Sequence, residues 1–348
     1  MVVNRDNSDK RMNTEIRRVQ KTGASTLTVS LPKDWADLSG LKPGDQVAMA
    51  VQADGTIVLD PRSDRRKEAV KKEIWTDGGE SAEHLKRKLI GAYLAGFNVI
   101  EVRSKERMDL ETKRAARDFA RMVIGPEVIE ETANSIVLHD LSDPVELPQK
   151  KCVRRMHLIV DTMHRDAMIA YAQGDLELAN DVIERDQDVD RLYWMTYKQY
   201  NLIQKDRSLA ERVGVDIHES MSLMLVARLI ERIGDHAEKI AKHALGSGKR
   251  GPAAEVGAIE KLSQEALVLL TKAMESYFLG DIGSANDIID KAEGLVHKAE
   301  GLLPDLQAHN GKGAVSSSSV LDSVIRTIMY ATDIAELAIN ESMRSEEK

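Results

Sequence analysis

From Lys150 onward, the pattern of apolar and polar residues is almost entirely that of helices. Apolar residues recur there at helical spacing, in segments rich in the strong helix formers Ala, Leu, Ile, Met, Glu and Lys. Helices are predicted over residues 150–173, 176–206, 216–246, 253–279, 282–303 and 317–344. Glycine-rich or polar breaks group them into two sets of three, which predicts tandem three-helix bundles over residues 150–246 and 253–345.

Residues 12–61 have the pattern of short strands instead. The stretch EIRRVQKTGASTLTVSLP is rich in Val, Thr and Leu and has a glycine turn at Gly23. A segment that can form one helical turn, KDWADLSG, follows. The stretch LKPGDQVAMAVQADGTIVLDP then predicts a hairpin with its turn at Asp54-Gly55. The predicted order is strand, strand, short helix, strand, hairpin turn and strand.

Between these regions the pattern is mixed. Residues 62–80 are highly charged and are interpreted as a linker. Residues 81–148 show an amphipathic helix ending near Gly96, the strand VIEVRS, a helix that stops at Gly125, and one or two further strands. The predicted fold class is therefore multidomain, with a small β-rich head, a small α+β middle unit and an all-α body.

The body contains an internal repeat. AYAQGDLELANDVIERD at 170–186 matches SYFLGDIGSANDIIDKA at 276–292 in its Tyr, Gly-Asp, Ala-Asn-Asp and Ile positions. RLIERIGDHAEKIA at 228–241 matches RTIMYATDIAELAI at 326–339 more weakly. Because the repeat unit is about one three-helix bundle, duplication of a bundle is the simplest explanation.

Composition narrows the class of protein. The chain has 348 residues, of which 42% are hydrophobic and one is cysteine, Cys152. This apolar content suffices for a packed core, and a lone cysteine suits a reducing compartment. The first residues have no apolar segment like that of a signal peptide, and no apolar run is long enough to span a bilayer. We therefore expect a cytoplasmic protein without membrane insertion.

Charge is distributed unevenly. The whole chain carries a formal net charge of −8, yet residues 1–66 contain 11 Lys and Arg against 9 Asp and Glu. Residues 10–21 alone hold five cationic residues against Glu15. A basic head on an acidic body permits contact with nucleic acid at the head only.

Carboxylates gather on two helices of the first predicted bundle. Glu231 and Asp235 are four residues apart, as are Asp186 and Asp190 on the preceding helix, so each pair shares one helix face. If the two helices pack against each other, the four carboxylates suit a hard or borderline divalent cation. Alternatively, nearby arginines pair with these carboxylates on a solvated face. The candidate partners are Arg185, Arg191, Arg228 and Arg232.

Histidines and nucleophiles suggest no catalytic centre. His157 and His164 are seven residues apart, as are His236 and His243, and neither pair has the four-residue spacing of a helical zinc pair. We expect these histidines at the surface or as helix caps. No pairing of a nucleophile with a base is evident, and the protein is not expected to be an enzyme.

Residues 13–61 resemble the AbrB-type swapped-hairpin domain, also called the SpoVT-AbrB or antitoxin-type domain. The matching residues are Arg18-Val19, Gly23, Ser25, Leu31-Pro32-Lys33, Leu41 and Gly44-Asp45-Gln46-Val47. The resemblance implies that two chains interleave, so a homodimer is the minimum assembly. It also implies that the first strand and its turn contact DNA through Arg11, Arg17, Arg18 and Lys21. The alternative is that the head only dimerises the protein or docks a partner.

Residues 150–345 resemble the PhoU family of phosphate uptake regulators. The resemblance rests on RLIERIGDHAEKIA, preceded by a helix carrying ERDQDVDRL, which fit the family's Glu/Asp-x-x-x-Asp motifs. It implies that Asp186, Asp190, Glu231 and Asp235 bind iron, zinc or another divalent metal. The second repeat departs from the pattern, because Met329, Ala292 and Val296 replace three of the four carboxylates. A metal is therefore expected on the first bundle alone.

An AbrB-like head on a PhoU-like body looks like archaeal PhoU-type regulators. The combination implies a transcriptional regulator of phosphate transport genes, with DNA and a second copy of the chain as partners. Two alternatives from other classes remain. One is a protein-level modulator of a phosphate ABC transporter, binding its ATPase or a signalling partner and using the head only to dimerise. The other is a bundle-type metalloenzyme, against which the lack of Glu-x-x-His motifs counts.

Overall fold

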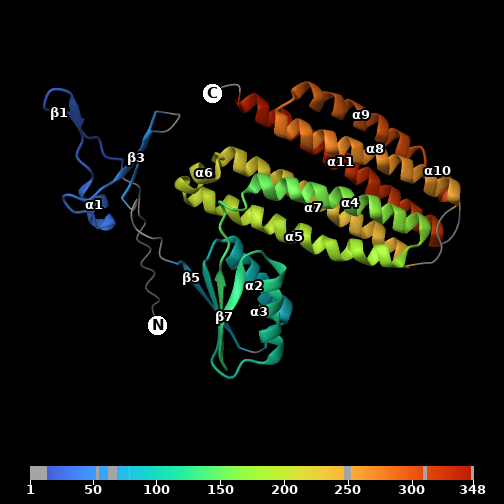
Figure 1. The fold of residues 1–348 in the computed structure, drawn as a ribbon, viewed down its shortest axis with the longest axis horizontal. Coiled ribbons are helices and arrows are strands. Elements are labelled where there is room, and N and C mark those ends of the chain that lie inside the picture. The colour runs from blue at the N-terminus through green and yellow to red at the C-terminus, as the bar shows by residue number, and fades with distance from the viewer. Residues whose placement is uncertain are drawn as a thin grey trace, which may run out of the picture. The chain divides into compact units, whose positions relative to one another are not determined.

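The computed structural model describes residues 14–51, 55–61, 69–77, 79–246, 252–308 and 312–345 (Figure 1). The chain divides into two compact units, Met1–Glu68 and Ala69–Lys348. The first unit is the predicted head. The second contains both the α+β middle unit and the helical body.

The head has the predicted order of elements. These are β1 (Gln20–Thr22), β2 (Thr26–Thr28), α1 (Lys33–Ser39), β3 (Ala48–Val51) and β4 (Ile57–Asp60). β1 pairs antiparallel with β2, and β3 with β4. Gly23 takes the left-handed conformation, φ 70°, that the tight β1–β2 turn requires.

The middle unit is a sheet with two helices on one face. Its elements are β5 (Lys71–Thr76), α2 (Ala82–Leu94), β6 (Val99–Ser104), α3 (Leu110–Met122), β7 (Pro126–Glu131) and β8 (Ser135–Asp140). The described strands are ordered β5-β6-β8-β7, with β5 and β6 parallel and the other neighbours antiparallel. Ile100, Val102, Ile136 and Leu138 point to the buried face, where they pack with Leu89 and Phe119 of the helices.

One prediction for this region was wrong. Residues 71–76, assigned to the linker, form the edge strand β5. Ile74 and Thr76 alternate inward, whereas Lys71, Glu73 and Trp75 lie on the open face of the sheet. The charged outer residues made the stretch look like a linker, and its partner β6 lies 28 residues further along the chain.

The body is formed by long helices close to those predicted. In the described part of the chain they are α4 (Gln149–Gln173), α5 (Leu176–Lys205), α7 (Ile217–Gly246), α8 (Ala253–Leu279), α9 (Ile282–Glu300) and α11 (Lys312–Ser345). Short helices α6 (Arg207–Val213) and α10 (Leu303–Ala308) join them. α11 begins at Lys312 and not at 317, because four consecutive serines, weak helix formers, continue the helix where a break was predicted.

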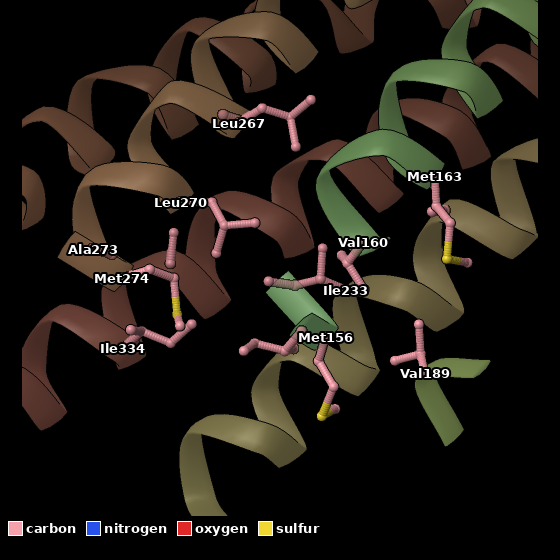
Figure 2. Packing of buried hydrophobic residues seen from close by; sticks show 14 of the residues in the cluster. Met156, Val160, Met163, Val189, Ile233, Leu267, Leu270, Ala273, Met274 and Ile334 are labelled. Carbon is pink, nitrogen blue, oxygen red and sulfur yellow. The ribbon is translucent and has the colours of Figure 1, made fainter. Parts of the chain in front are cut away.

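The two bundles share one hydrophobic core. Buried residues of α4, α5 and α7 belong to the same cluster as those of α8, α9 and α11. Figure 2 shows this packing around Met156 and Val160 of α4, Ile233 of α7, and Leu270 of α8. Residues 149–345 are therefore one packed body and not two independent domains.

The structure also shows the repeat. Gly174 and Gly280, 106 residues apart, both end their helices in the left-handed conformation. The following residues, Asp175 and Asp281, both accept hydrogen bonds from backbone amides as N-caps of the next helix. The equivalent parts of the two bundles are thus built by the same local capping.

The middle unit is fixed to α5. Lys198 of α5 forms a buried ion pair with Asp140 at the end of β8, and its Nζ donates to Ser142 Oγ at 3.0 Å. Asn201 donates to the carbonyl of Leu94, the last residue of α2, at 2.8 Å, and Lys205 donates to that of Ala95 at 2.7 Å. No helix of the described residues is long and apolar enough to cross a membrane.

Candidate cation site and nucleic-acid interface

The packing of α5 against α7 brings the four predicted carboxylates together. Asp186 and Asp190 lie on α5, and Glu231 and Asp235 on α7. The helices approach closely at Gly234, where an added Cβ would lie 3.3 Å from Asp186 Oδ1. The glycine between Ile233 and Asp235 therefore makes room for an α5 carboxylate, a role that the spacing of residues in the sequence does not reveal.

The electrostatics of the cluster reflect burial and mutual repulsion. Burial, followed by repulsion from Asp190 and Glu238, raises the pKa of Asp186 to about 7. Burial and Asp235 raise the pKa of Glu231 to about 7, and burial with the same neighbour raises that of Asp190 to about 6. The pKa of Asp235 is also raised, chiefly by burial. A cation would relieve all four.

Glu231 is only half satisfied by the protein. Arg228 Nη1 donates to Glu231 Oε1 at 2.9 Å, and its guanidinium lies 5.3 Å from the Tyr193 ring centroid. The other oxygen, Glu231 Oε2, is buried and has no hydrogen-bond partner. A buried carboxylate oxygen without a partner is unfavourable, so it is a candidate ligand for a cation.

The alternative of arginine pairing is realised in part. Arg185 pairs with Asp166 and Asp181, at 2.6 and 2.8 Å, and not with the cluster. Arg191 lies 3.9 Å from Asp188. Among the predicted arginine partners in the described chain, only Arg228 forms an ion pair with one of the four carboxylates.

The residues fit a divalent cation in chemistry and charge. Carboxylate oxygens are ligands for hard and borderline metals, and the unpartnered Glu231 Oε2 is one available donor. In the described chain, no three His, Cys, Asp or Glu side chains converge as a metal-binding group. Binding would thus require these side chains to move together.

The second bundle lacks this arrangement. Met329 is 44% exposed where the first repeat has Glu231, and Ala292 is buried where it has Asp186. Asp333 remains, and burial with repulsion from Glu336 raises its pKa. A single carboxylate with one acidic neighbour is a poor candidate for a metal centre.

The histidine prediction was wrong for His164. This residue is fully buried between the bundles, with Nε2 3.1 Å from Thr327 Oγ1 and Nδ1 3.2 Å from Ser263 Oγ. Burial lowers its pKa to about 4. His243 similarly lies 2.9 Å from Ser319 Oγ. His164 of α4 and His243 of α7 both lie on the side of the first bundle that meets the second, where serine and threonine hydroxyls are their hydrogen-bond partners.

Of the predicted DNA-contacting residues, Lys21 lies on β1, and Arg17 and Arg18 lie in the segment just before it. Arg17, Arg18 and Lys21 are exposed, and Arg17 forms an ion pair with Glu15. Arg11 lies outside the described residues. Within the described chain, Arg18 and Lys21 form no ion pair.

The head exposes its apolar side chains. No described residue between 14 and 61 is buried. Large apolar residues point into solvent, among them Ile16, Leu27, Leu38, Met49 and Val51, each at least 66% exposed. A single copy therefore has no core of its own within the described residues.

Comparison with known families confirms both resemblances. The PhoU domain matches residues 153–244, and the family "Antidote-toxin recognition MazE, bacterial antitoxin" matches residues 20–67. The chain thus carries a PhoU domain behind an AbrB/MazE-type head. These are families of regulatory proteins and not of enzymes, as expected. The second bundle lies outside the matched segment and is linked to the first by the internal repeat.

Several similar proteins are PhoU proteins. A phosphate-specific transport system accessory protein PhoU from Serratia marcescens is 25% identical over 181 residues, 51% of this chain and 71% of that protein. A homolog from Clostridium acetobutylicum is 28% identical over 87 residues, 25% of this chain and 36% of that protein. Another from Zymomonas mobilis is 35% identical over 96 residues, 27% of this chain and 38% of that protein. The chain therefore spans between about one third and seven tenths of these relatives.

Among solved structures, PhoU from Pseudomonas aeruginosa superimposes with a TM-score of 0.49 at 21% identity. The alignment covers 58% of this chain and 98% of that one.

Proposed function

We propose that this protein is a cytoplasmic, DNA-binding regulator of phosphate transport genes. The observation that carries the proposal is the presence of a PhoU domain and an AbrB/MazE-type head in one chain. The exposed basic segment that leads into β1 of the head, with Arg17, Arg18 and Lys21, supports DNA contact, because Lys and Arg contacts to phosphates dominate such affinity. The body would respond to the phosphate supply, and the head would change its binding to DNA accordingly.

The proposal includes a homodimer joined through the head. Its apolar residues are exposed in one copy, and burying them against a second copy would supply the missing core. Two copies would also place two basic strands on one DNA duplex.

The proposal also places a divalent cation, such as iron or zinc, at Asp186, Asp190, Glu231 and Asp235. Bound there, it would neutralise the repulsion that raises the pKa values of these groups. The protein's own part is to hold the carboxylates on two adjoining helices. Arg228 keeps one oxygen of Glu231 in place and leaves the other available.

The test is recovery of genomic DNA from the source organism by the full-length protein at about physiological salt. The proposal expects enrichment of sequences upstream of phosphate-transport genes. Arg17→Ala/Arg18→Ala should abolish the enrichment. Arg114→Ala/Arg121→Ala, which removes the same charge from exposed positions on the middle unit, should retain it. No specific fragment retained by the unmodified protein would contradict the proposal.

A second candidate is a protein-level modulator of a phosphate transporter. The named relatives are accessory proteins of a phosphate-specific transport system, which favours this class. In that case the chain would co-purify with a transporter ATPase or its signalling partner and would show no specific DNA affinity. Arg17→Ala/Arg18→Ala would then leave this co-purification unchanged.

A further inference from the structure

The middle unit contains a βαβ motif whose parallel strands end at the same edge of the sheet. β5 and β6 are hydrogen-bonded neighbours, and α2 connects them. Thr76 at the end of β5 is paired in register with Ser104 at the end of β6. In parallel sheets, ligands bind in the crevice outside the carboxyl ends of the strands.

A cavity of about 760 Å³ opens at this edge. It is lined by residues from the ends of both strands and from the first turns of α2. The lining includes Trp75, Asp77, His84, Ser104, Lys105 and Glu106. The volume lies within the range of small-molecule sites, and none of the assigned functions of the head or body uses it.

One wall of the cavity offers a surface for stacking. Trp75 is 52% exposed, although it lies within a strand. The guanidinium of Arg103, its neighbour on β6, lies 5.9 Å from the ring centroid and supports one side of it. An exposed tryptophan at a cavity wall can stack against a planar ring, and such stacking contributes substantially to nucleotide binding.

The charged residues around the cavity restrict the ligand further. Lys88 is paired with Glu80 at 2.8 Å, whereas Lys105, His84 and Glu106 form no ion pair in the described chain. The N-terminus of α2, capped by Ser81, adjoins the cavity through His84 and favours an anion. Lys105 can supply a matching cation. Lys105 and the start of α2 are thus the part of the lining that favours an anion.

The acidic residues of the lining point to a ribose and limit the number of phosphates. Asp77 and Glu106 can accept hydrogen bonds from sugar hydroxyls, as a carboxylate beside a parallel strand does in dinucleotide-binding folds. Three carboxylates against two lysines in the lining would repel a diphosphate or triphosphate. The site thus combines a stacking wall, hydroxyl acceptors and capacity for one phosphate.

We propose that this cavity binds a ribonucleoside monophosphate. Its base stacks on Trp75, its ribose hydroxyls meet the carboxylates, and its phosphate lies near Lys105 and the start of α2. The proposal does not depend on the DNA-binding function.

The test is isothermal titration of the full-length protein with AMP, GMP, CMP and UMP, and with adenosine, ribose 5-phosphate and inorganic phosphate. At least one mononucleotide should bind at about one per chain with a micromolar dissociation constant. Its nucleoside and ribose 5-phosphate should bind roughly 10-fold more weakly or worse, the loss expected when a good contact is missing. Inorganic phosphate binding as tightly as every mononucleotide, or no binding by any mononucleotide at about 1 mM, would overturn the proposal.

Substitutions in the cavity wall test whether the nucleotide binds at this cavity. Trp75→Ala and Lys105→Ala should each weaken it roughly 10-fold. Trp75→Phe, which keeps a ring, should stay within about 3-fold, and Lys272→Ala on α8 is the distant control. These positions are exposed or at the cavity wall, and circular dichroism checks that each variant is folded. Binding unchanged by both Trp75→Ala and Lys105→Ala would also overturn the proposal.

Discussion

Arg228 Nη1 lies 2.9 Å from Glu231 Oε1, while Glu231 Oε2 is buried without a partner. One arginine thus satisfies one oxygen of a carboxylate whose pKa is raised by burial and by its acidic neighbours Asp235 and Asp190. Arg232, Glu238 and Lys242 also act on the cluster, and their charges partly offset one another. The cluster therefore depends on a proton or a cation for its stability.

Lower pH should stabilise the metal-free protein through this cluster. Unfolded Asp and Glu have pKa values near 4, whereas the folded pKa is about 7 for Asp186 and Glu231. The folded state therefore retains protons that the unfolded state releases. The stabilising contribution is fully present below about pH 4 and is lost as the pH rises through about 7.

The measurement is Tm in chelator at pH 5.5 and 7.5 for the wild type and Asp186→Asn/Glu231→Gln. The variant should melt at least about 3 °C higher than the wild type at pH 7.5, and the difference should shrink at pH 5.5. His164 and His236, whose pKa values burial lowers to about 4, act in the opposite sense but are present in both proteins. Equal pH dependence in the two proteins would contradict this account.

A divalent cation should stabilise the wild type at pH 7.5. A ligand at 100 times its Kd adds about 2.7 kcal/mol, which is several degrees in Tm for a protein of this size. Titration with Mn²⁺, Fe²⁺ or Zn²⁺ checks this. Asp186→Asn/Asp190→Asn should lose the response, and Asp333→Asn in the second bundle should keep it. A response that persists in the first variant would place the metal elsewhere.

Arg17→Ala/Arg18→Ala should weaken DNA binding and its dependence on salt together. Each phosphate contact contributes about 0.9 to the slope of log K against log salt, so removal of contacts reduces that slope by about one each. Fluorescence anisotropy over a salt series measures both quantities. Arg114→Ala/Arg121→Ala should leave the slope unchanged. A weaker affinity with an unchanged slope would mean that the two arginines support the fold of the head and not DNA contact.

The long helices were the most predictable part of the fold. Caps such as Gly174 with Asp175, and Gly280 with Asp281, are local signals that fix where helices end. The edge strand at 71–76 was not predictable, because only two of its residues point inward and its pairing with β6 is non-local. The start of α11 was missed because tertiary packing outweighs the weak helical preference of serine.

For the site, sequence spacing correctly put each carboxylate pair on one helix face. That the two faces meet, and that Gly234 permits the approach, depends on the packing of α5 against α7. The buried position of His164 was likewise set by a partner bundle about 100 and 160 residues away in the chain. The sequence did hold one sign of this position: Ser263 and Thr327, the two hydroxyl partners of His164, fall among the apolar positions of their own helices.

The buried ion pair of Lys198 and Asp140 should stabilise the junction of the middle unit with α5 only while both partners are present. Both side chains are at most 6% exposed, and burial lowers the pKa of Lys198. Lys198→Met would leave a buried carboxylate without its partner, at a cost of about 3–5 kcal/mol. Hydrogen exchange at the interface of the middle unit with α5 should increase accordingly. Lys198→Met/Asp140→Leu should recover much of the protection, and equal exchange in the two variants would contradict a charge-based role.

Gly125→Ala should disrupt the same junction from the other side. Gly125 has φ 108°, and an added Cβ would overlap Asp140 Oδ1 and lie 2.7 Å from Ser142 Cβ. Asp140 cannot yield easily, because Ser142 Oγ donates to it at 2.7 Å and Lys198 holds its other oxygen. We expect a loss of about 3 kcal/mol or more, seen as a lower denaturant midpoint.

Gly214→Ala is the matched control for this prediction. Gly214 also has a positive φ, 71°, but an added Cβ there meets nothing within 4 Å. Gly214→Ala should therefore lower the free energy of unfolding by about 1 kcal/mol, the cost of placing an L residue in the left-handed conformation. The difference between the two variants reports the extra cost at the junction, which comes from the steric clash and from a φ of Gly125 that L residues adopt less readily than that of Gly214. If the two substitutions lower the free energy of unfolding equally, the predicted clash of an added Cβ with Asp140 and Ser142 is wrong.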